Sequence, residues 1–129
     1  MISLWINGQP PRKSNNRRIV YQGNRPRVIK SQKALDWTKS ALLQVPDHAK
    51  LNLGSLDDPL CINMDIWYET RRPDLSGELV LDMLQKAGVI ADDRYVYALH
   101  LYKHFDKDAP GIGIQIQKMS ELQQKGTDR

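Results

Sequence analysis

The residues best suited to chemistry lie in the stretch TRRPDLSGELVLDMLQKAGVIADDRYV. Asp74 follows two arginines and a proline near its start, and the pair Asp92-Asp93 comes near its end. Between them, Glu78 and Asp82 continue from Asp74 at intervals of four residues. On a helix this spacing places the three carboxylates on one face, where they repel each other unless a positive group compensates.

Two interpretations of these carboxylates are open from the residues alone. In the first, Asp74 caps a helix N-terminus, where free N–H groups and the helix dipole favour an acid, and Asp92-Asp93 is a solvated loop. In the second, the loop after the helix folds back and brings Asp93, with Asp92 beside it, close to Asp74. Hard carboxylate oxygens in one cleft suit Mg²⁺, with Mn²⁺ as an alternative ion. Such an ion polarises a phosphodiester and activates water.

The basic residues are concentrated at the start of the chain. Eight of the 19 basic residues, and none of the 15 acidic ones, precede Asp36. This split predicts a basic N-terminal arm over residues 9–30 for a polyanion, beside an acidic centre that holds cations. In PPRKSNNRR, arginine and lysine fit phosphate contacts and the asparagines fit hydrogen bonds that fix position. A solvated basic loop is the alternative interpretation.

Other classes of protein are disfavoured by what the sequence contains. Its apolar runs are too short to span a bilayer, and its first residues lack the order of a signal peptide. The single cysteine, Cys61, lies in a strand-like pattern, so we expect it in the core of a protein from a reducing cytoplasm. His100 and His104 would form a zinc pair on a helix, but YVYALHLYKHF alternates as a strand does.

The elements that must position these residues predict one α+β domain over residues 1–129. We expect a mixed β-sheet with two main helices packed against it. Periodicity and turn residues predict strands at 2–6, 60–69, 94–105 and 111–117, and a hairpin at 19–29 around Gln22-Gly23-Asn24. Helices are predicted at 32–45, capped by Ser31, and at 75–87, ended by Gly88. The polar tail, residues 118–129, is predicted to be disordered.

Taken together, PPRKSNNRR, RRPDL and LDMLQKAGVIADDRYV resemble the RusA family of Holliday-junction resolvases, endodeoxyribonucleases common in prophages. The resemblance extends from about Trp5 to Ile116. It implies a RusA-like fold and a homodimeric, Mg²⁺-dependent nuclease that cuts paired strands of a four-way DNA junction in recombination and repair. It also implies a cytoplasmic protein, encoded by a bacterial host or a phage. The implied metal ligands are Asp74 and Asp93, with Asp92 as their neighbour.

The same resemblance assigns DNA contacts and reveals differences from the family pattern. Basic and amide side chains that would meet DNA are Arg12, Lys13, Asn15, Asn16, Arg17, Arg18, Arg71 and Arg72. Ser76-Gly77 stands where the family usually has Asp-Asn, and Glu78 takes the place of an expected catalytic lysine. We therefore expect Glu78 to replace the missing carboxylate. The alternatives are a catalytically impaired RusA-like protein that binds DNA junctions, and a module whose basic arm binds an acidic protein.

Overall fold

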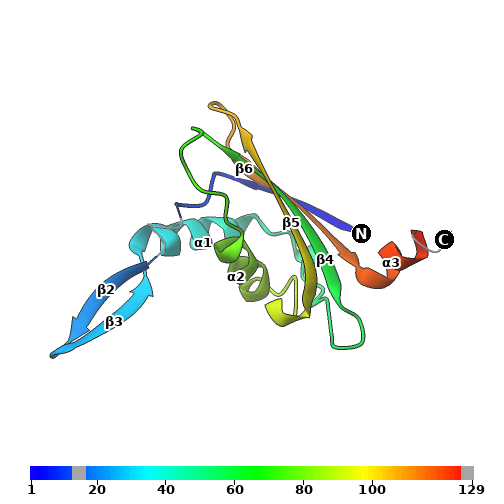
Figure 1. Ribbon diagram of the computed structural model, residues 1–129, viewed down its shortest axis with the longest axis horizontal. Coiled ribbons are helices and arrows are strands. Elements are labelled where there is room, and N and C mark those ends of the chain that lie inside the picture. The colour runs from blue at the N-terminus through cyan, green and yellow to red at the C-terminus, as the bar shows by residue number, and fades with distance from the viewer. Residues whose placement is uncertain (13–16, 126–129) are drawn as a thin grey trace.

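A mixed four-stranded sheet organises the fold in a computed structural model, which describes residues 1–12 and 17–125. The strand order is β1-β6-β4-β5, with β1 at Ile2–Asn7, β6 at Gly111–Lys118, β4 at Leu60–Tyr68 and β5 at Val96–Phe105 (Figure 1). Only β4 and β5 are parallel, and helix α2 (Glu78–Lys86) lies in the crossover between them, as a parallel pair requires. The predicted α+β class and mixed sheet are confirmed.

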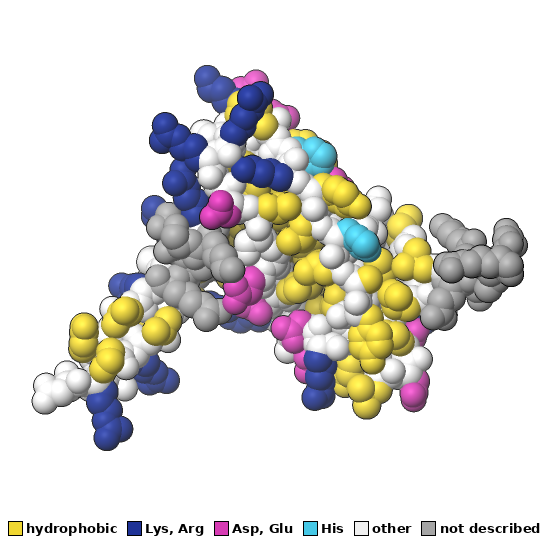
Figure 2. Space-filling view, in the orientation of Figure 1, with side chains coloured by type: hydrophobic (Ala, Val, Ile, Leu, Met, Phe, Trp, Pro, Cys, Tyr) yellow, Lys and Arg dark blue, Asp and Glu magenta, His cyan; other side chains and the backbone are white. Residues whose placement is uncertain are grey.

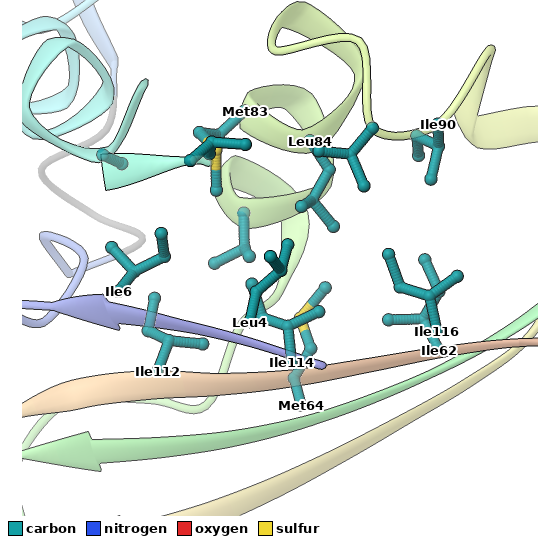
Figure 3. Close-up of a cluster of buried hydrophobic side chains, with 14 of the residues drawn as sticks. Leu4, Ile6, Ile62, Met64, Met83, Leu84, Ile90, Ile112, Ile114 and Ile116 are labelled. Atoms are coloured by element: carbon teal, nitrogen blue, oxygen red, sulfur yellow. The ribbon is translucent and has the colours of Figure 1, made fainter. Parts of the chain in front are cut away.

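The core lies between this sheet and two helices, α1 (Gln32–Gln44) and α2 (Figure 3). Strand β4 alternates as predicted, with Ile62 and Met64 fully buried on the side that faces the helices. Met83 and Leu84 of α2 meet them from above. Burying each such side chain contributes about 1.5 to 3 kcal/mol, so this layer holds α2 firmly on the sheet.

The first helix begins where the sequence predicts. The Ser31 side chain accepts a hydrogen bond from the backbone N–H of Ala34 at 3.1 Å, which satisfies one of the free donors of the helix start. Val45 and Pro46 follow the last helical residue. A short 3₁₀ helix, η2 (Asp47–Ala49), then leads into the loop before β4. Cys61 is buried, as expected.

The basic arm forms a separate two-stranded sheet. Strands β2 (Arg17–Gln22) and β3 (Arg25–Lys30) pair antiparallel around a turn at Gly23, whose φ is +63° (Figure 1). The predicted hairpin is confirmed, and it projects away from the four-stranded sheet. At its base, Lys30 Nζ lies 3.7 Å from a carboxylate oxygen of Asp82 on α2.

The outer face of the sheet explains the glycines in GIGIQI. A Cβ at Gly111 would overlap the Trp5 ring and lie 2.8 Å from the carbonyl oxygen of Ile6. The absence of a side chain at Gly111 therefore makes room for a tryptophan on the neighbouring strand. Trp67 on β4 lies beside Trp5, with ring centroids 5.5 Å apart, and stacks on His104 of β5 at 4.4 Å. His100 and His104 thus both belong to a strand, as the alternation predicts.

Two predicted boundaries in the part of the chain after α2 differ from the structure. The strand expected at 94–105 begins at Val96, because residues Asp93–Tyr95 form a 3₁₀ helix, η3. The tail expected to be disordered from 118 forms helix α3 (Met119–Lys125) directly after β6. The Met119 N–H donates to the carbonyl oxygen of Pro59 at 2.9 Å, which fixes the start of this helix on the loop before β4.

Residues 126–129 lie outside the described part of the chain, as do three predicted DNA contacts, Lys13, Asn15 and Asn16, and the side chain of Arg17. No helix within the described ranges is both long enough and apolar enough to cross a membrane.

Candidate active site

The loop before α2 is fixed by buried groups at several points. Pro73 is buried, and the buried Tyr68 at the end of β4 donates its hydroxyl proton to the carbonyl oxygen of Asp74 at 3.4 Å. A hydrogen bond from the backbone of Ser76 also reaches Tyr68. Burial raises the pKa of the Tyr68 hydroxyl, so this group stays a protonated donor at neutral pH. The backbone of Asp74 is therefore positioned while its side chain remains exposed.

Helix α2 starts later than the sequence predicts, and Asp74 is not its cap. The helix begins at Glu78, with Gly77 at the N-cap position and no side-chain cap. The reason is a close approach to the sheet: a Cβ at Gly77 would lie 2.8 Å from the nearest Leu101 side-chain carbon and 3.2 Å from the Met64 sulfur. The departure Ser76-Gly77 from the family pattern thus has a packing role at its glycine.

The loop after α2 is also anchored, but through its backbone. Gly88 has a φ of +79°, which only glycine adopts without strain, and it follows the helix as the predicted C-cap signal. Beyond it, the Leu53 N–H donates to Val89 O at 2.9 Å and the Ala91 N–H donates to Leu53 O at 2.8 Å. This short parallel bridge directs the chain into Asp92.

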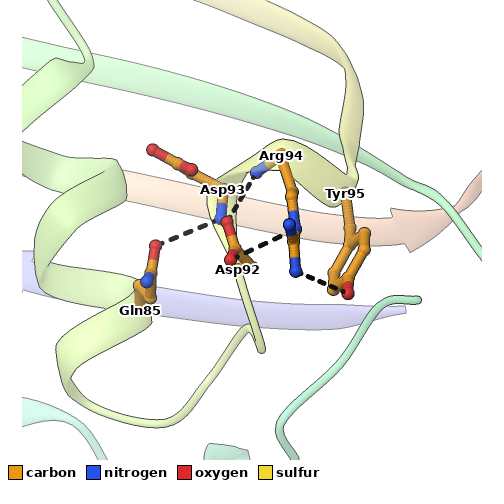
Figure 4. A network of polar contacts seen from close by, with 5 residues as sticks. All are labelled: Gln85, Asp92, Asp93, Arg94 and Tyr95. Carbon is orange, nitrogen blue, oxygen red and sulfur yellow. Dashed lines mark hydrogen bonds and ion pairs between the residues drawn. The ribbon is translucent and has the colours of Figure 1, made fainter. Parts of the chain in front are cut away.

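Asp92 and Asp93 lie in a polar network with three neighbours (Figure 4). The Asp92 carboxylate accepts the backbone N–H of Arg94 at 3.0 Å and pairs with the Arg94 guanidinium at 3.3 Å. The backbone N–H of Asp93 donates to the side-chain oxygen of Gln85 on α2 at 3.1 Å. The Asp93 carboxylate itself points away from Arg94 in Figure 4. Asp93 is thus exposed while its backbone is held by Gln85.

The two carboxyl groups have opposite pKa shifts. The backbone N–H of Arg94 lowers the pKa of Asp92 because it stabilises the charged form. The pKa of Asp93 is raised, first because its carboxyl shares a hydrogen bond with Asp92, then by desolvation and by the charges of Asp92 and Asp82. The two carboxyl groups therefore titrate as one coupled pair, in which Asp93 retains a proton more readily than Asp92. A divalent cation between two such carboxylates would relieve this repulsion.

Asp82 is a third carboxylate whose charge acts on the pair, and it is not among the predicted site residues. The negative charge of Asp82 raises the pKa of Asp93. Lys30 of the basic hairpin pairs with the Asp82 carboxylate and partly compensates its charge on α2. The sequence could have indicated Asp82, because it lies near the start of the segment LDMLQKAGVIADDRYV and Asp92-Asp93 near its end. Glu78 lies one turn earlier on α2 and is exposed, and Asp74 lies outside the helix.

The charges of Asp92 and Asp82 both act on Asp93, whereas the grouping of Asp74 with Asp92 and Asp93 stays a prediction. The contacts of Asp74 are with Tyr68, at the other end of the loop and helix. Within the described residues, no three His, Cys, Asp or Glu side chains converge as a formed metal-binding group. The donor set is nevertheless of the right chemistry, since carboxylate oxygens are the ligands that Mg²⁺ and Mn²⁺ prefer.

The predicted DNA contacts that the structure describes are on the surface. In the arm, Arg12 and Arg18 are exposed, and they flank the segment outside the described residues. Arg71 and Arg72 are exposed after β4. Figure 2 shows Lys and Arg side chains gathered over the loops at one end of the sheet and along the hairpin, with acidic groups between them. Positive and acidic surfaces thus alternate on one face of the molecule.

Comparison with known proteins identifies the family. The sequence model of a family described as Endodeoxyribonuclease RusA matches residues 8–117, which contain both the basic arm and the acidic motif. A curated relative, the crossover junction endodeoxyribonuclease RusA of Aquifex aeolicus (strain VF5), is 27% identical over 119 residues, covering 90% of each chain. The matched range contains α1, β4, α2 and β5, so the sequence resemblance is confirmed over most of the fold. The chain belongs to the RusA family of endodeoxyribonucleases.

Proposed function

We propose that this protein is a Mg²⁺-dependent endodeoxyribonuclease that resolves four-way DNA junctions by paired phosphodiester hydrolysis, in recombination and repair in the cytoplasm. Membership of the RusA family and the name of its Aquifex relative support the substrate. The observation that carries the proposed catalytic centre is the Asp92-Asp93 pair after α2, where Gln85 holds the Asp93 backbone and Arg94 contacts the Asp92 carboxylate. Carboxylates that repel one another in this way favour a divalent cation between them.

The proposed residue roles follow from position. Asp93 and Asp92 would hold the ion, with Asp82 as a further carboxylate on α2. When bound, Mg²⁺ polarises the phosphodiester and lowers the pKa of a water molecule. Asp74 and Glu78 remain candidate catalytic groups on the family resemblance, and the loop that Tyr68 holds presents the Asp74 carboxylate to solvent. Arg94 keeps Asp92 ionised, so the pair retains a negative charge for the ion.

The first test is cleavage of a synthetic four-way junction in Mg²⁺ and in Mn²⁺. Wild type should cut it, and Asp93→Asn should cut at least about 100-fold more slowly with junction affinity retained, because a metal ligand is lost. Asp47→Asn is the matched control, since that side chain is 98% exposed on η2 and belongs to another surface. Tight binding with no metal-dependent nicking, in wild type and variant alike, would support the impaired junction-binding protein instead.

The basic arm supplies a second test, through salt dependence. Replacing Arg17 and Arg18 together by alanine should weaken DNA binding and reduce the slope of log affinity against log salt by about two phosphate equivalents. The measurement is fluorescence anisotropy of a labelled junction at several salt concentrations. An unchanged slope would count against the arm as a phosphate contact and favour an acidic protein partner.

We also propose that the active form is a homodimer. A four-way junction has two symmetric strands to cut, and two symmetric sites are supplied by two copies of one chain. Light scattering at the concentrations used for cleavage should give twice the chain mass of 14.8 kDa. A mass of one chain under conditions that support paired cutting would overturn this arrangement.

A further inference from the structure

A pocket outside the acidic centre lies where β4 and β5 end. Its volume is about 630 Å³, and it is lined by Glu69, Thr70, Arg71, Arg72, Phe105 and Lys107. A second hollow of about 300 Å³ shares two of these residues, Arg71 and Phe105, and adds Lys103 and His104. This part of the surface carries the gathered Lys and Arg side chains above the sheet in Figure 2. None of the roles proposed above uses its aromatic residue.

The aromatic wall of the pocket is built to present a flat face. The Phe105 side chain is 49% exposed although it ends a strand of the main sheet, so its ring is not used to fill the core. The guanidinium carbon of Arg71 lies 5.4 Å from the ring centroid, within range of a cation–π contact. An exposed ring beside a planar cation offers a stacking surface for a nucleobase.

The remaining walls are predominantly cationic. Lys103 Nζ donates to the carbonyl oxygen of Arg71 at 2.7 Å, which holds its charge and the Arg71 backbone together. Arg72 and Lys107 are exposed at the rim. Glu69 is the one acid in the lining of the pocket as described, so the local charge favours a phosphate.

The nearby acid Asp106 is already engaged. Its carboxylate accepts the backbone N–H groups of Asp108 and Ala109 at 3.0 and 3.1 Å, within the turn between β5 and β6. That turn also carries Lys107, so the same hydrogen bonds fix the loop on which this lysine stands. The rim of the pocket is thus shaped by the turn rather than by an opposing acid.

The combination of ring and cations distinguishes the kinds of DNA that fit. A duplex stacks its bases on each other and offers mainly phosphates to such a surface. The Phe105 ring does not bind phosphates, so it would add little to duplex binding. An unpaired nucleotide offers both a base face and a phosphate. A volume of about 630 Å³ lies within the usual range for small-molecule sites and is adequate for one nucleotide.

We propose that this pocket binds an unpaired nucleotide of a DNA strand, with the base stacked on Phe105 and the phosphate held by Arg72 and Lys107. The inference rests on the proposed function, since an unpaired nucleotide arises where a junction opens at its branch point. Arg72 precedes Asp74 by two residues, so the pocket and the Asp74 loop are consecutive along the chain. A DNA strand bound in this pocket would therefore lie close to the loop that carries Asp74.

The test compares single-stranded and duplex DNA. Phe105→Ala should lower the affinity for a labelled oligothymidylate of about twelve nucleotides by tenfold or more, because stacking contributes about 1 to 3 kcal/mol per base. Affinity for a duplex of the same length should change by less than about twofold, because phosphate contacts remain. Phe105→Trp should retain single-strand binding, and Lys107→Gln should reduce its salt slope by about 0.7.

Tyr97→Ala is the matched control, because Tyr97 is 61% exposed on the same strand but does not line the pocket. Unchanged oligothymidylate affinity in Phe105→Ala, or an equal loss for duplex and single strand, would overturn the inference. Junction cleavage by wild type is measured alongside. Cleavage without a Phe105 effect rejects the pocket alone, whereas a Phe105 effect without cleavage rejects the nuclease and keeps the pocket.

Discussion

Helix α2 lies between two loops that each present aspartate, residues 69–77 before it and residues 87–95 after it. In the first loop, the backbone is fixed by buried groups: Tyr68 beneath Asp74, and Gly77 against Leu101. In the second loop, backbone bridges position the chain, but the carboxylates are placed by each other and by Arg94. The first loop is thus held by the core, and the Asp92-Asp93 end of the second loop is held by surface electrostatics.

This difference determines what each loop responds to. Contacts with the core are insensitive to salt and pH, so the position of Asp74 changes only when packing changes. The Asp92-Asp93 pair lies on the surface, where protonation and cations alter its interactions directly. A site assembled from both loops would therefore have a rigid half and a half that responds to the ion.

The largest effect should come from breaking the packed loop at Gly77. Gly77→Val places a branched side chain where even a Cβ would lie 2.8 Å from a Leu101 carbon. Such overpacking costs about 1 to 3 kcal/mol, equivalent to a fall in melting temperature of roughly 4 to 15 °C for a domain of this size. Thermal unfolding followed by circular dichroism measures this change.

The control for Gly77→Val is Ser40→Val, at an exposed position of α1. It adds the same side chain to a helix surface and should change the melting temperature by only a degree or two. Junction cleavage should fall in Gly77→Val even at temperatures where the protein is fully folded, because the segment that carries Asp74 must shift. Equal melting temperatures in the two variants would show that the loop is not held by packing.

A smaller effect is expected when only the polar anchor of the same loop is removed. Tyr68→Phe keeps the buried ring but deletes the hydroxyl that contacts the Asp74 carbonyl and the Ser76 backbone. Losing these bonds should cost about 0.5 to 1.5 kcal/mol. Urea unfolding measures it. A loss as large as that of Gly77→Val would mean that the polar anchor, rather than the glycine contact, holds the loop.

Much of this fold was predictable from local patterns. Alternation in β4 and the capping of α1 by Ser31 depend on neighbours within a few residues, and both are confirmed. The start of α2 was not predictable in this way. Asp74 is a favourable cap by type, but Gly77 approaches Leu101, 24 positions away in the sequence, and residues 74–77 stay outside the helix.

The candidate site shows the same limit. The carboxylates of the motif were recognised from their types and spacing, and the Asp92-Asp93 pair is a close pair in the structure. Which helix carboxylate approaches that pair depends on how the return loop folds. The bridge between Leu53 and Ile90 directs this loop, and it places Asp82 within electrostatic range of Asp93. No periodicity in the sequence encodes such a bridge.

The smallest predicted effect lies in the loop held by electrostatics and has the opposite sign. Asp93→Asn should stabilise the protein at neutral pH, because it removes repulsion from Asp92 and Asp82. The gain should be at most about 0.5 kcal/mol, since exposed charges are screened. The raised pKa of Asp93 means that its shared proton stabilises the folded protein below the ordinary aspartate pKa, and this stabilisation is lost as pH rises through the raised value.

Urea midpoints of wild type and Asp93→Asn should therefore differ at neutral pH and converge as the pH falls toward the ordinary pKa of aspartate, about 3.9. Asp74→Asn is the control, because its side chain is exposed and its loop is held by Tyr68 and Gly77. It should leave the midpoint unchanged at both pH values. A stabilisation of Asp93→Asn that persists at acidic pH would show that the gain comes from packing or hydrogen bonding, and that charge repulsion does not distinguish the second loop from the first.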